Sequence, residues 1–550
     1  MAKTALTKLL RQIHLAHAEA AATGLPADVS FELQRARRLQ RAEFLAGAAS
    51  AGVALLTGCA PSTSPNGAQT GAGSPSAGAR GTAGRVAIVG GGLAGVSCAY
   101  RLWQAGVPFT LCEANSAFGG RTWTLRGFFD HGQIVEHGGE FISSEHTAIR
   151  KLASELGLTL VNLRSGQPKD TEEIYWRWNQ KYTFAEMLAD YRHVYPAMAA
   201  AAKAAPFPVL YNRYNKAGFE LDHMSVRQWI ERNVPGGLDS KIGWLLDLDC
   251  TTENGGESAV QSSLELIQML GYYPALTTHD QFYLVGTDEL FGVQGGNDQI
   301  VGRMIKQLPA ASLRPNTALE ALARRSDGSY QLTFRSALQT VELTADHVLL
   351  AIPFTTLRRV DLSKAGFSPL KMTAINELPL GTNTKLHAQF DKRVWYKLGY
   401  NGYTYSDTDY EQTWEVTRKQ PGPTGILTSY YGGDWGASFR VPSFAPAQPG
   451  YTHQFVKGLE LLYPGATAAY NGKAYMDYWT GDPWHRGSYS YGKVGQYTKF
   501  IGIEDVPQGN VRFAGEHVSI DFAGFMNGAV ETGEKAAAGI LHAMGVATKA

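Results

Sequence analysis

The chain has 550 residues, of which 44% are apolar, so it is long enough to build two packed domains. Its 50 basic and 49 acidic residues give a formal net charge of +1, and no stretch beyond the N-terminal region gathers Lys and Arg into a stripe that could neutralise phosphates. Nucleic acid is therefore not expected as a partner. No metal is expected either, because CxxC spacing, the sign of a zinc site, is missing among Cys59, Cys98, Cys112 and Cys250.

The first 60 residues have the order of an export signal, with several arginines followed by an apolar run over 46–56. This run is too short to span a bilayer as a stable helix. It ends in Leu56-Thr57-Gly58-Cys59, which resembles a bacterial lipobox, where the cysteine is lipidated after cleavage. Residues 61–84 are rich in Ser, Gly, Ala and Pro and are typical of a flexible linker. We expect an exported protein, periplasmic or lipid-anchored to a bacterial membrane through Cys59; the alternative is a disordered N-terminus with no targeting role.

A nucleotide-binding pattern begins at residue 85. The apolar run 86–89 predicts a strand, and Gly90-Gly91-Gly92-Leu93-Ala94-Gly95 follows it directly, before a helical pattern. In a GxGxxG turn of this kind, the first glycine (Gly90) permits the tight turn and the second (Gly92) lets the backbone approach a pyrophosphate. The third (Gly95) lets the helix pack close to the strand.

A second predicted strand, 109–111, ends next to Glu113 and Ala114. This is the spacing at which an acidic side chain binds a ribose hydroxyl in dinucleotide-binding βαβ units. The complete unit therefore predicts a dinucleotide site, rather than a glycine-rich turn of some other α/β fold.

The residues after Glu113 favour FAD over NAD. The run from Glu113 through Gly119-Gly120-Arg121 to Thr124 resembles the start of the flavin-containing amine oxidase family, the group of monoamine, polyamine and L-amino acid oxidases. In that family the arginine lies beside the flavin diphosphate, and a guanidinium suits this place because it pairs with phosphate oxygens at two points. Further motifs carry the resemblance from about 85 to 541: Gly138-Gly139-Glu140-Phe141, Glu516, and Gly524-Phe525-Met526.

The resemblance implies an α/β fold with an α+β substrate domain. The expected FAD-binding domain is Rossmann-like, of the glutathione-reductase and amine-oxidase type, and is discontinuous. Its pieces are 85–145, 295–360 and 505–550. The inserts 146–294 and 361–504 should form the substrate domain, the first mostly helical and the second built on a sheet over the flavin.

The resemblance also implies three catalytic residues. Lys385, in an otherwise apolar or neutral predicted strand, matches the family's lysine that holds a water at flavin N5 and assists reoxidation by oxygen. Tyr489 and Phe525 match two aromatic side chains on the reactive face of the flavin, with Phe525 in place of the usual second tyrosine. The alternatives are a strand lysine that reaches solvent and ordinary aromatic core. Ser488 lies where animal monoamine oxidases have the cysteine that bonds FAD, so noncovalent FAD is expected.

The substrate class stays open between amines and L-amino acids. Phe141 lies where oxidases of the snake-venom type have an arginine for the substrate carboxylate, which favours an amine, or a carboxylate held from elsewhere. The long N-terminal extension, in contrast, resembles that of bacterial L-amino acid oxidases acting on basic amino acids. Carboxylates that could attract a basic tail are Glu140, Asp247, Asp249 and Glu253. Aromatic residues that could line the cavity are Tyr430, Tyr431, Trp479 and Trp484.

The expected function is oxidative deamination of a primary amine or L-amino acid, basic ones included, to imine or carbonyl, ammonia and hydrogen peroxide. The expected partners are this small molecule and molecular oxygen, and a homodimer stays open. Two alternatives keep the FAD scaffold: a desaturase or protoporphyrinogen-oxidase relative, and a lipid-anchored flavoprotein without catalysis. A desaturase should show a broad apolar channel rather than Tyr489 together with Lys385.

Overall fold

The computed structural model describes residues 5–36, 84–205, 207–271, 288–337 and 339–546. The predicted apolar run 46–56, Cys59 and the predicted linker up to residue 83 lie outside the described residues. The chain divides into two compact units, one of residues 12–83 and one of residues 1–11 with 84–550. Helix α1 (Ala5–Thr23) begins in the second and continues into the first. Among the helices of the described part, none is both long and apolar enough to cross a membrane.

A five-stranded parallel sheet forms the centre of the nucleotide-binding region. Its order is β21-β13-β1-β2-β9, and all neighbours are parallel. The strands are β1 (Val86–Val89), β2 (Phe109–Cys112), β9 (Leu313–Arg314), β13 (His347–Leu350) and β21 (Val511–Phe513). Residues of β1 and β13 are buried on both faces, which explains why β1 and residues 348–350 of β13 are continuous apolar runs rather than alternating ones. The sheet therefore joins segments that lie more than 400 residues apart in the sequence, 86–89 and 511–513.

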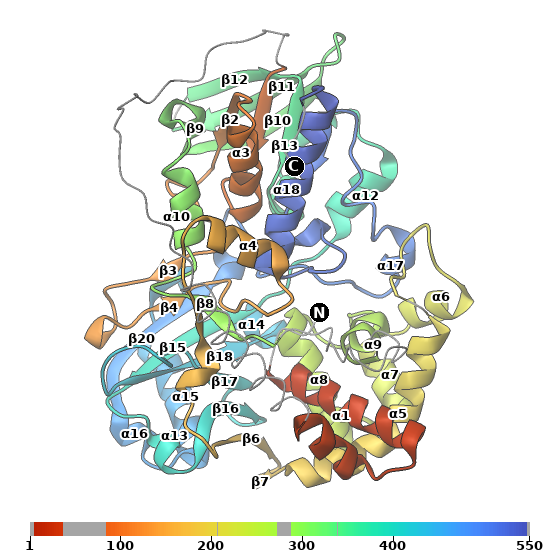
Figure 1. The fold of residues 1–550 in the computed structure, drawn as a ribbon, viewed down its shortest axis with the longest axis vertical. Helices are drawn as coiled ribbons and strands as arrows, with labels where there is room; N and C mark the ends of the chain where they lie inside the picture. Colours follow the sequence, from red (N-terminus) through yellow and green to blue (C-terminus); the bar gives the residue numbers. More distant parts are fainter. Residues whose placement is uncertain (1–4, 37–83, 206, 272–287, 338, 547–550) are drawn as a thin grey trace, which may run out of the picture. The chain divides into compact units, whose positions relative to one another are not determined.

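Helices α3 (Leu93–Gln104) and α18 (Met526–Ala543) lie side by side against this sheet, as Figure 1 shows. Their close approach depends on Gly533 of α18, where a Cβ would meet the Ala94 carbonyl oxygen at 2.2 Å. The apolar side chains between helices and sheet form one core, which also includes Ile149 and Leu152 of α4 (Thr147–Glu155) and residues of α10 (Gln299–Ile305).

A four-stranded sheet packs on the other face of the parallel sheet. Its order is β12-β11-β10-β14, and its strands are β10 (Thr317–Arg324), β11 (Tyr330–Ser336), β12 (Gln339–Ala345) and β14 (Asp361–Lys364). Leu332 and Phe334 of β11 share a buried cluster with Val348 and Leu350 of β13. Helices α11 (Phe354–Leu357) and α12 (Pro369–Glu377) come after strand β13 in the sequence.

An eight-stranded sheet forms the second large layer, in the order β19-β20-β15-β18-β17-β16-β6-β7. Its strands are β6 (Glu172–Arg177), β7 (Gln180–Lys181), β15 (Thr384–Phe390), β16 (Tyr400–Ser406), β17 (Gln412–Glu415), β18 (Gly425–Tyr431), β19 (Phe444–Pro446) and β20 (Tyr470–Tyr478). Every residue of β15, the strand that carries Lys385, is buried. One face of this sheet packs on α15 (Pro449–Leu462), and short helices α13 (Val394–Lys397), α14 (Gly433–Ser438), α16 (Ala466–Ala469) and α17 (Gln496–Lys499) connect its strands and the C-terminal region.

The first insert is mostly helical, as expected. Its helices after α4 are α5 (Phe184–Ala204), α6 (Lys216–Asp222), α7 (Val226–Asn233), α8 (Lys241–Asn254) and α9 (Ser263–Gly271). Local signals start them: Thr183 and Glu186 form a capping box at α5, and Ser240 caps α8. The insert also contains the small sheet of β5 (Leu160–Asn162) with β8 (Phe291–Val293), and another small sheet, β3 (Thr124–Leu125) with β4 (Val135–Glu136), precedes the insert.

The α/β fold class with a Rossmann-like sheet and an inserted mixed region is confirmed. The division at residues 146 and 361 stays a prediction, and two elements pack across it. Helix α4 belongs to the core of α3 and α18, and β14 pairs with β10. Both follow directly on a piece of the nucleotide-binding region in the sequence, and their apolar residues pack onto that region.

Candidate active site

A cavity of about 710 Å³ extends from the glycine-rich turn of the parallel sheet to the eight-stranded sheet. Its walls bring together the segments that the sequence placed at a cofactor site. Of the predicted site residues, all except Gly95 line it: Gly90, Gly92, Leu93, Ala94, Glu113, Ala114, Gly119, Gly120, Arg121, Gly138, Gly139, Glu140, Phe141, Lys385, Tyr489, Glu516, Gly524, Phe525 and Met526.

The glycine-rich turn is held by backbone contacts that leave no room for a side chain at Gly90 or Gly95. Gly90 has φ +102°, and a Cβ there would meet the Ala351 carbonyl oxygen at 2.4 Å. A Cβ on Gly95 would lie 1.9 Å from the Gly90 carbonyl oxygen, so Gly95 acts by packing α3 against the turn rather than by facing the cavity. Gly92 is the N-cap of α3 and offers no side-chain cap, which leaves the first N–H groups of the helix for another acceptor at the cavity wall.

Glu113 accepts hydrogen bonds from two backbone N–H groups. The Gly91 N–H donates to Oε2 at 2.6 Å, and the Asn115 N–H donates to Oε1 at 2.7 Å. Burial raises the pKa of this carboxyl, while the backbone hydrogen bonds act in the opposite direction. Each oxygen retains a lone pair, so the side chain can accept further hydrogen bonds from ribose hydroxyls.

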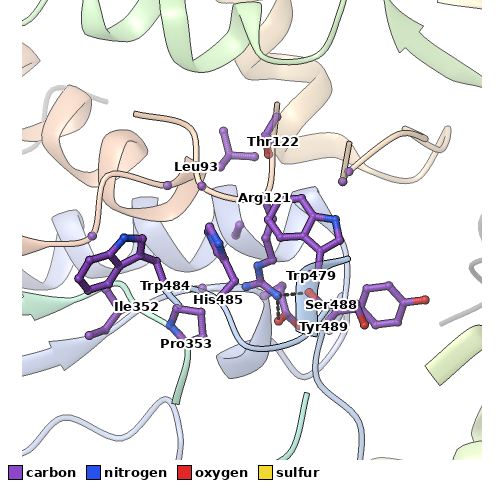
Figure 2. A pocket seen from close by; sticks show the side chains of 18 of the residues that line it. Leu93, Arg121, Thr122, Ile352, Pro353, Trp479, Trp484, His485, Ser488 and Tyr489 are labelled. Carbon is purple, nitrogen blue, oxygen red and sulfur yellow. Dashed lines mark hydrogen bonds and ion pairs between the residues drawn. The ribbon is translucent and has the colours of Figure 1, made fainter. Parts of the chain in front are cut away.

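Arg121 links the first motif to the last one. Its Nη1 donates to the Ser488 carbonyl oxygen at 2.6 Å and to Glu516 Oε1 at 2.8 Å, and Figure 2 shows the guanidinium pointing toward Ser488. The other oxygen of Glu516 accepts from the Gly524 N–H and the Ser490 hydroxyl, both at 2.7 Å. Burial alone would raise the pKa of Glu516, but the charges of Arg121 and His517 and the hydrogen bonds from Arg121 and Ser490 together outweigh burial, and the pKa falls to about 2. Glu516 is thus a buried anion that holds three segments together.

Lys385 is fixed at the junction of the two sheets. Its Nζ donates to the carbonyl oxygens of Glu136 at 3.0 Å and Gly138 at 2.9 Å, and to Glu140 Oε2 at 2.8 Å. The lysine is only 6% exposed, so the alternative of a strand lysine reaching solvent does not describe it. The second oxygen of Glu140 accepts from Trp414 Nε1 at 2.9 Å. An ammonium with three acceptors is a charged donor, and its position is set by the Gly138-Gly139 turn.

A buried hydrogen-bond chain supports the same turn from behind. His137 Nδ1 and His387 Nε2 contact the two oxygens of Asp477 at 2.5 and 2.9 Å, and all three side chains are fully buried. Trp479 Nε1 donates to the His137 carbonyl oxygen at 2.9 Å. Burial would raise the pKa of Asp477, but its two histidine partners lower it. The residue before Gly138 and the strand of Lys385 are thereby tied to β20.

Of the two predicted aromatic side chains, Tyr489 faces β18 and Phe525 starts α18. The Tyr489 hydroxyl is 2.7 Å from the Tyr430 hydroxyl. Phe525 is the N-cap residue of α18, and its ring centroid is 4.9 Å from that of His146. Ser488 lines the cavity and donates to Asn383 Oδ1 at 2.6 Å.

Several lining residues were not predicted as site residues. Tyr403, Gln412 and Trp414 lie on β16 and β17, and Glu289 precedes β8. Tyr403, Trp414 and Tyr430 form one aromatic cluster with Phe141. Alternation along β16 to β18 could have suggested which aromatic residues share a face, but Glu289 has no motif around it.

Some of the aromatic and acidic residues predicted to line the cavity do not line it. Tyr430, Trp479 and Trp484 line the cavity, but Tyr431 does not, because neighbours on a strand point to opposite faces and Tyr431 packs in the core with Phe439. Asp247, Asp249 and Glu253 are on α8 and do not line it, whereas Glu140 does.

Comparison with known proteins identifies the family. The sequence model of the flavin containing amine oxidoreductases matches residues 93–541. The chain belongs to this family. The bovine flavin-containing amine oxidase A is 22% identical over 488 residues, covering 84% of this chain and 85% of the bovine one. The putative L-amino-acid oxidase YobN of Bacillus subtilis is 24% identical, covering 82% and 93%.

Solved structures agree on the fold. Wild-type putrescine oxidase bound to putrescine superposes with a TM-score of 0.69 at 20% identity, covering 84% of this chain and 99% of the other. At this identity the match shows the fold and leaves the substrate open.

The residues of the cavity fit the flavin that the family contains. The N-termini of α3 and α18 both lack a side-chain cap, which suits a diphosphate and the carbonyl groups of a flavin ring. The buried His137 Nε2 and both ring nitrogens of His517 have no hydrogen-bond partner among the described residues, although both histidines line the cavity. Unpaired buried polar atoms of this kind are accounted for by a polar ligand.

Proposed function

We propose that the chain catalyses the oxidative deamination of a primary amine or L-amino acid, with noncovalently bound FAD and with oxygen as the electron acceptor. The supporting observation is the fixed ammonium of Lys385, which lies beside the Gly138-Gly139 turn in a cavity that also contains Tyr489 and Tyr430. A bound flavin would supply the redox chemistry by accepting a hydride from the carbon next to nitrogen and returning two electrons to oxygen.

The bonds that break and form in the reaction determine what the protein must provide. The C–H bond gives up its electron pair, the nitrogen loses a proton, and a C=N bond forms; water then converts the imine to carbonyl and ammonia, and oxygen becomes hydrogen peroxide. The substrate nitrogen must be neutral, so the cavity must desolvate it. The aromatic cluster of Tyr403, Trp414, Tyr430 and Phe141 provides such a wall and excludes water from the imine.

Lys385 keeps a positive charge at this wall. Its three acceptors use all three ammonium protons, so a water bound by Lys385 would replace one of them. Whether it donates to that water or acts by charge alone, the ammonium stabilises the negative charge that develops as oxygen is reduced.

The proposal of noncovalent attachment is supported by the residue at position 488. Ser488 has no thiol, and its hydroxyl donates to Asn383. Acid precipitation of the holoenzyme should release all of the yellow chromophore into the supernatant as FAD. Flavin retained in the protein pellet would contradict this.

The purified holoenzyme tests the reaction directly. Primary amines and L-amino acids should bleach the flavin absorbance without oxygen and should release hydrogen peroxide with oxygen, and catalase should abolish the peroxide signal. A chain that no amine or amino acid bleaches would contradict the proposal and favour a desaturase-like enzyme or a flavoprotein without catalysis.

Export is a separate proposal, supported by the arginines, the apolar run and the lipobox-like Cys59. In a bacterial host, palmitate label should enter the parent chain and not Cys59→Ala. Unlabelled parent protein in the cytoplasm would contradict export.

A further inference from the structure

Glu289 is a buried carboxylate at the wall of the aromatic part of the cavity. It lies just before β8 and is 5% exposed. Its φ is +47°, a conformation that residues other than glycine rarely adopt. The Glu289 N–H donates to Ser143 Oγ at 3.1 Å, and Phe291 pairs with Ile142 by two backbone hydrogen bonds of 2.7 and 2.8 Å. A strained backbone that neighbours hold in place points to a functional role for the side chain.

The Glu289 carboxylate has no hydrogen bond or ion pair with any described residue. Its backbone N–H is the group that bonds to Ser143. Burial, and after it the negative charge of Glu253, raise the pKa of Glu289 well above its usual range, while the charge of Arg164 acts against this. A buried carboxylate without a partner is costly, and a cation entering the cavity removes that cost.

Two other charged side chains that line the cavity, Glu140 and Lys385, neutralise each other. They form an ion pair at 2.8 Å. After burial, the charge of Glu289 is among the influences that raise the pKa of Tyr403 and of Tyr489, so it lies near enough to act on both tyrosines. Electron-rich ring faces next to a carboxylate are a favourable environment for an organic cation.

We propose that Glu289 binds a second cationic group of the substrate, so that the site accepts molecules with an amine to be oxidised and a distal ammonium or guanidinium. Diamines and L-amino acids with a basic side chain share this chemistry. The inference rests on the proposed amine oxidation and names its substrate class. Phe141 and Trp414, whose ring centroids are 6.1 Å apart, also line the cavity and add no charge to it.

Four substrates separate the distal charge from the carboxylate: L-lysine, cadaverine, L-norleucine and n-pentylamine. L-lysine is compared with L-norleucine, and cadaverine with n-pentylamine. In at least one of these two pairs, the parent holoenzyme should show a kcat/KM at least tenfold higher for the compound with the distal ammonium. Comparison of L-lysine with cadaverine then shows whether the substrate is an amino acid or an amine. If the distance between Glu289 and the oxidised amine does not suit a five-carbon chain, diamines of other lengths, each compared with the monoamine of equal length, should show the preference instead.

Glu289→Gln keeps the shape and removes the charge. It should lower kcat/KM for dicationic substrates by about 10- to 100-fold, the range of a hydrogen bond to a charged group, and leave neutral-tailed substrates within about twofold. The matched control is Glu342→Gln, a change of an exposed carboxylate on β12. Most of the loss should appear in the Kd from anaerobic flavin reduction rather than in the limiting reduction rate.

Thermal unfolding provides a readout besides activity. Without substrate, Glu289→Gln should melt at the same temperature as the parent or higher, because it removes an unpaired buried carboxylate. Under anaerobic conditions cadaverine or L-lysine should raise the Tm of the parent more than that of the variant.

Two results would overturn the inference while the proposed function stands: amines bleach the flavin but the parent shows no preference for a distal cation at any chain length, or Glu289→Gln leaves that preference unchanged. A flavin that no amine bleaches, together with no thermal shift by a dication, would contradict both.

Discussion

The two regions that form the cavity contribute to it in different ways. In the region of the parallel sheet, the lining groups come from short continuous motifs, such as the turn 90–95, and backbone atoms do much of the work. In the region of the eight-stranded sheet, the lining groups are single side chains from several strands, such as Lys385 on β15, Trp414 on β17 and Tyr430 on β18. A cofactor common to a family can be bound by a fixed backbone, whereas a substrate particular to one enzyme requires side chains that can change one at a time. Substitutions in the first region should therefore affect stability and flavin content, and those in the second should affect rates.

The largest effect is expected at the glycine turn. In Gly95→Ala the new Cβ would lie 1.9 Å from the Gly90 carbonyl oxygen, a backbone atom that cannot move without opening the turn. We expect a loss of stability of about 3 kcal/mol or more and loss of bound flavin, measured by denaturant unfolding and by the ratio of flavin to protein.

The control is Gly302→Ala on α10, where a Cβ would meet nothing within 4 Å. It should be neutral or stabilising by up to about 1 kcal/mol, because alanine is the better helix former. Full flavin content and parent stability in Gly95→Ala would show that the turn is not rigid.

Glu516 gives the second largest effect, and it depends on pH. Its pKa is lowered from 4.5 to about 2 in the folded state, so its contribution to stability is fully present above pH 4.5 and is lost as the pH falls toward 2. Glu516→Gln should therefore cost about 3 kcal/mol at pH 7, and the difference from the parent should narrow below pH 4.5. Unfolding free energies measured between pH 7 and pH 3.5 check this. A difference that does not depend on pH would mean that the Arg121 pair is not the source of the stability.

Lys385→Met tests the substrate side. The variant should keep its fold and flavin with some loss of stability, because Glu140 loses its ammonium partner but still accepts from Trp414 Nε1. Reoxidation of the reduced enzyme by oxygen should slow by about 100-fold, the usual effect of removing one preorganised charge. Anaerobic reduction should change less. Stopped-flow traces of the two half-reactions, with the exposed Lys364→Met of β14 as control, separate the outcomes. If the variant reoxidises as fast as the parent, Lys385 is a structural residue.

Tyr430→Phe should have the smallest effect. It removes the 2.7 Å hydroxyl contact with Tyr489 and leaves the aromatic ring in its cluster. A lost neutral hydrogen bond of about 1 kcal/mol should lower kcat/KM two- to tenfold without changing the flavin content. Tyr214→Phe, at a tyrosine that is 49% exposed, is the control. A large loss of flavin in Tyr430→Phe would contradict the contrast between the two regions.

The sequence by itself determined the fold class and the cofactor side of the site. The turn 90–95 and Glu113 are local signals, because a strand, a tight turn and a helix N-terminus each depend on residues close in sequence. Resemblance to a family added Lys385 and Tyr489, which no local rule would select, and of the residues predicted for catalysis and cofactor binding all but Gly95 line one cavity.

Only the tertiary structure decided which groups meet on the substrate side. The pairing of Lys385 with Glu140, 245 residues apart, and the exclusion of Tyr431 from the cavity depend on strand register and on the face that each residue occupies. The carboxylate of Glu289, which has no partner among the described residues, cannot be recognised in the sequence for the same reason. Whether a charge is buried and whether it has a partner depend on residues brought together from the whole chain, and no periodicity or motif encodes either.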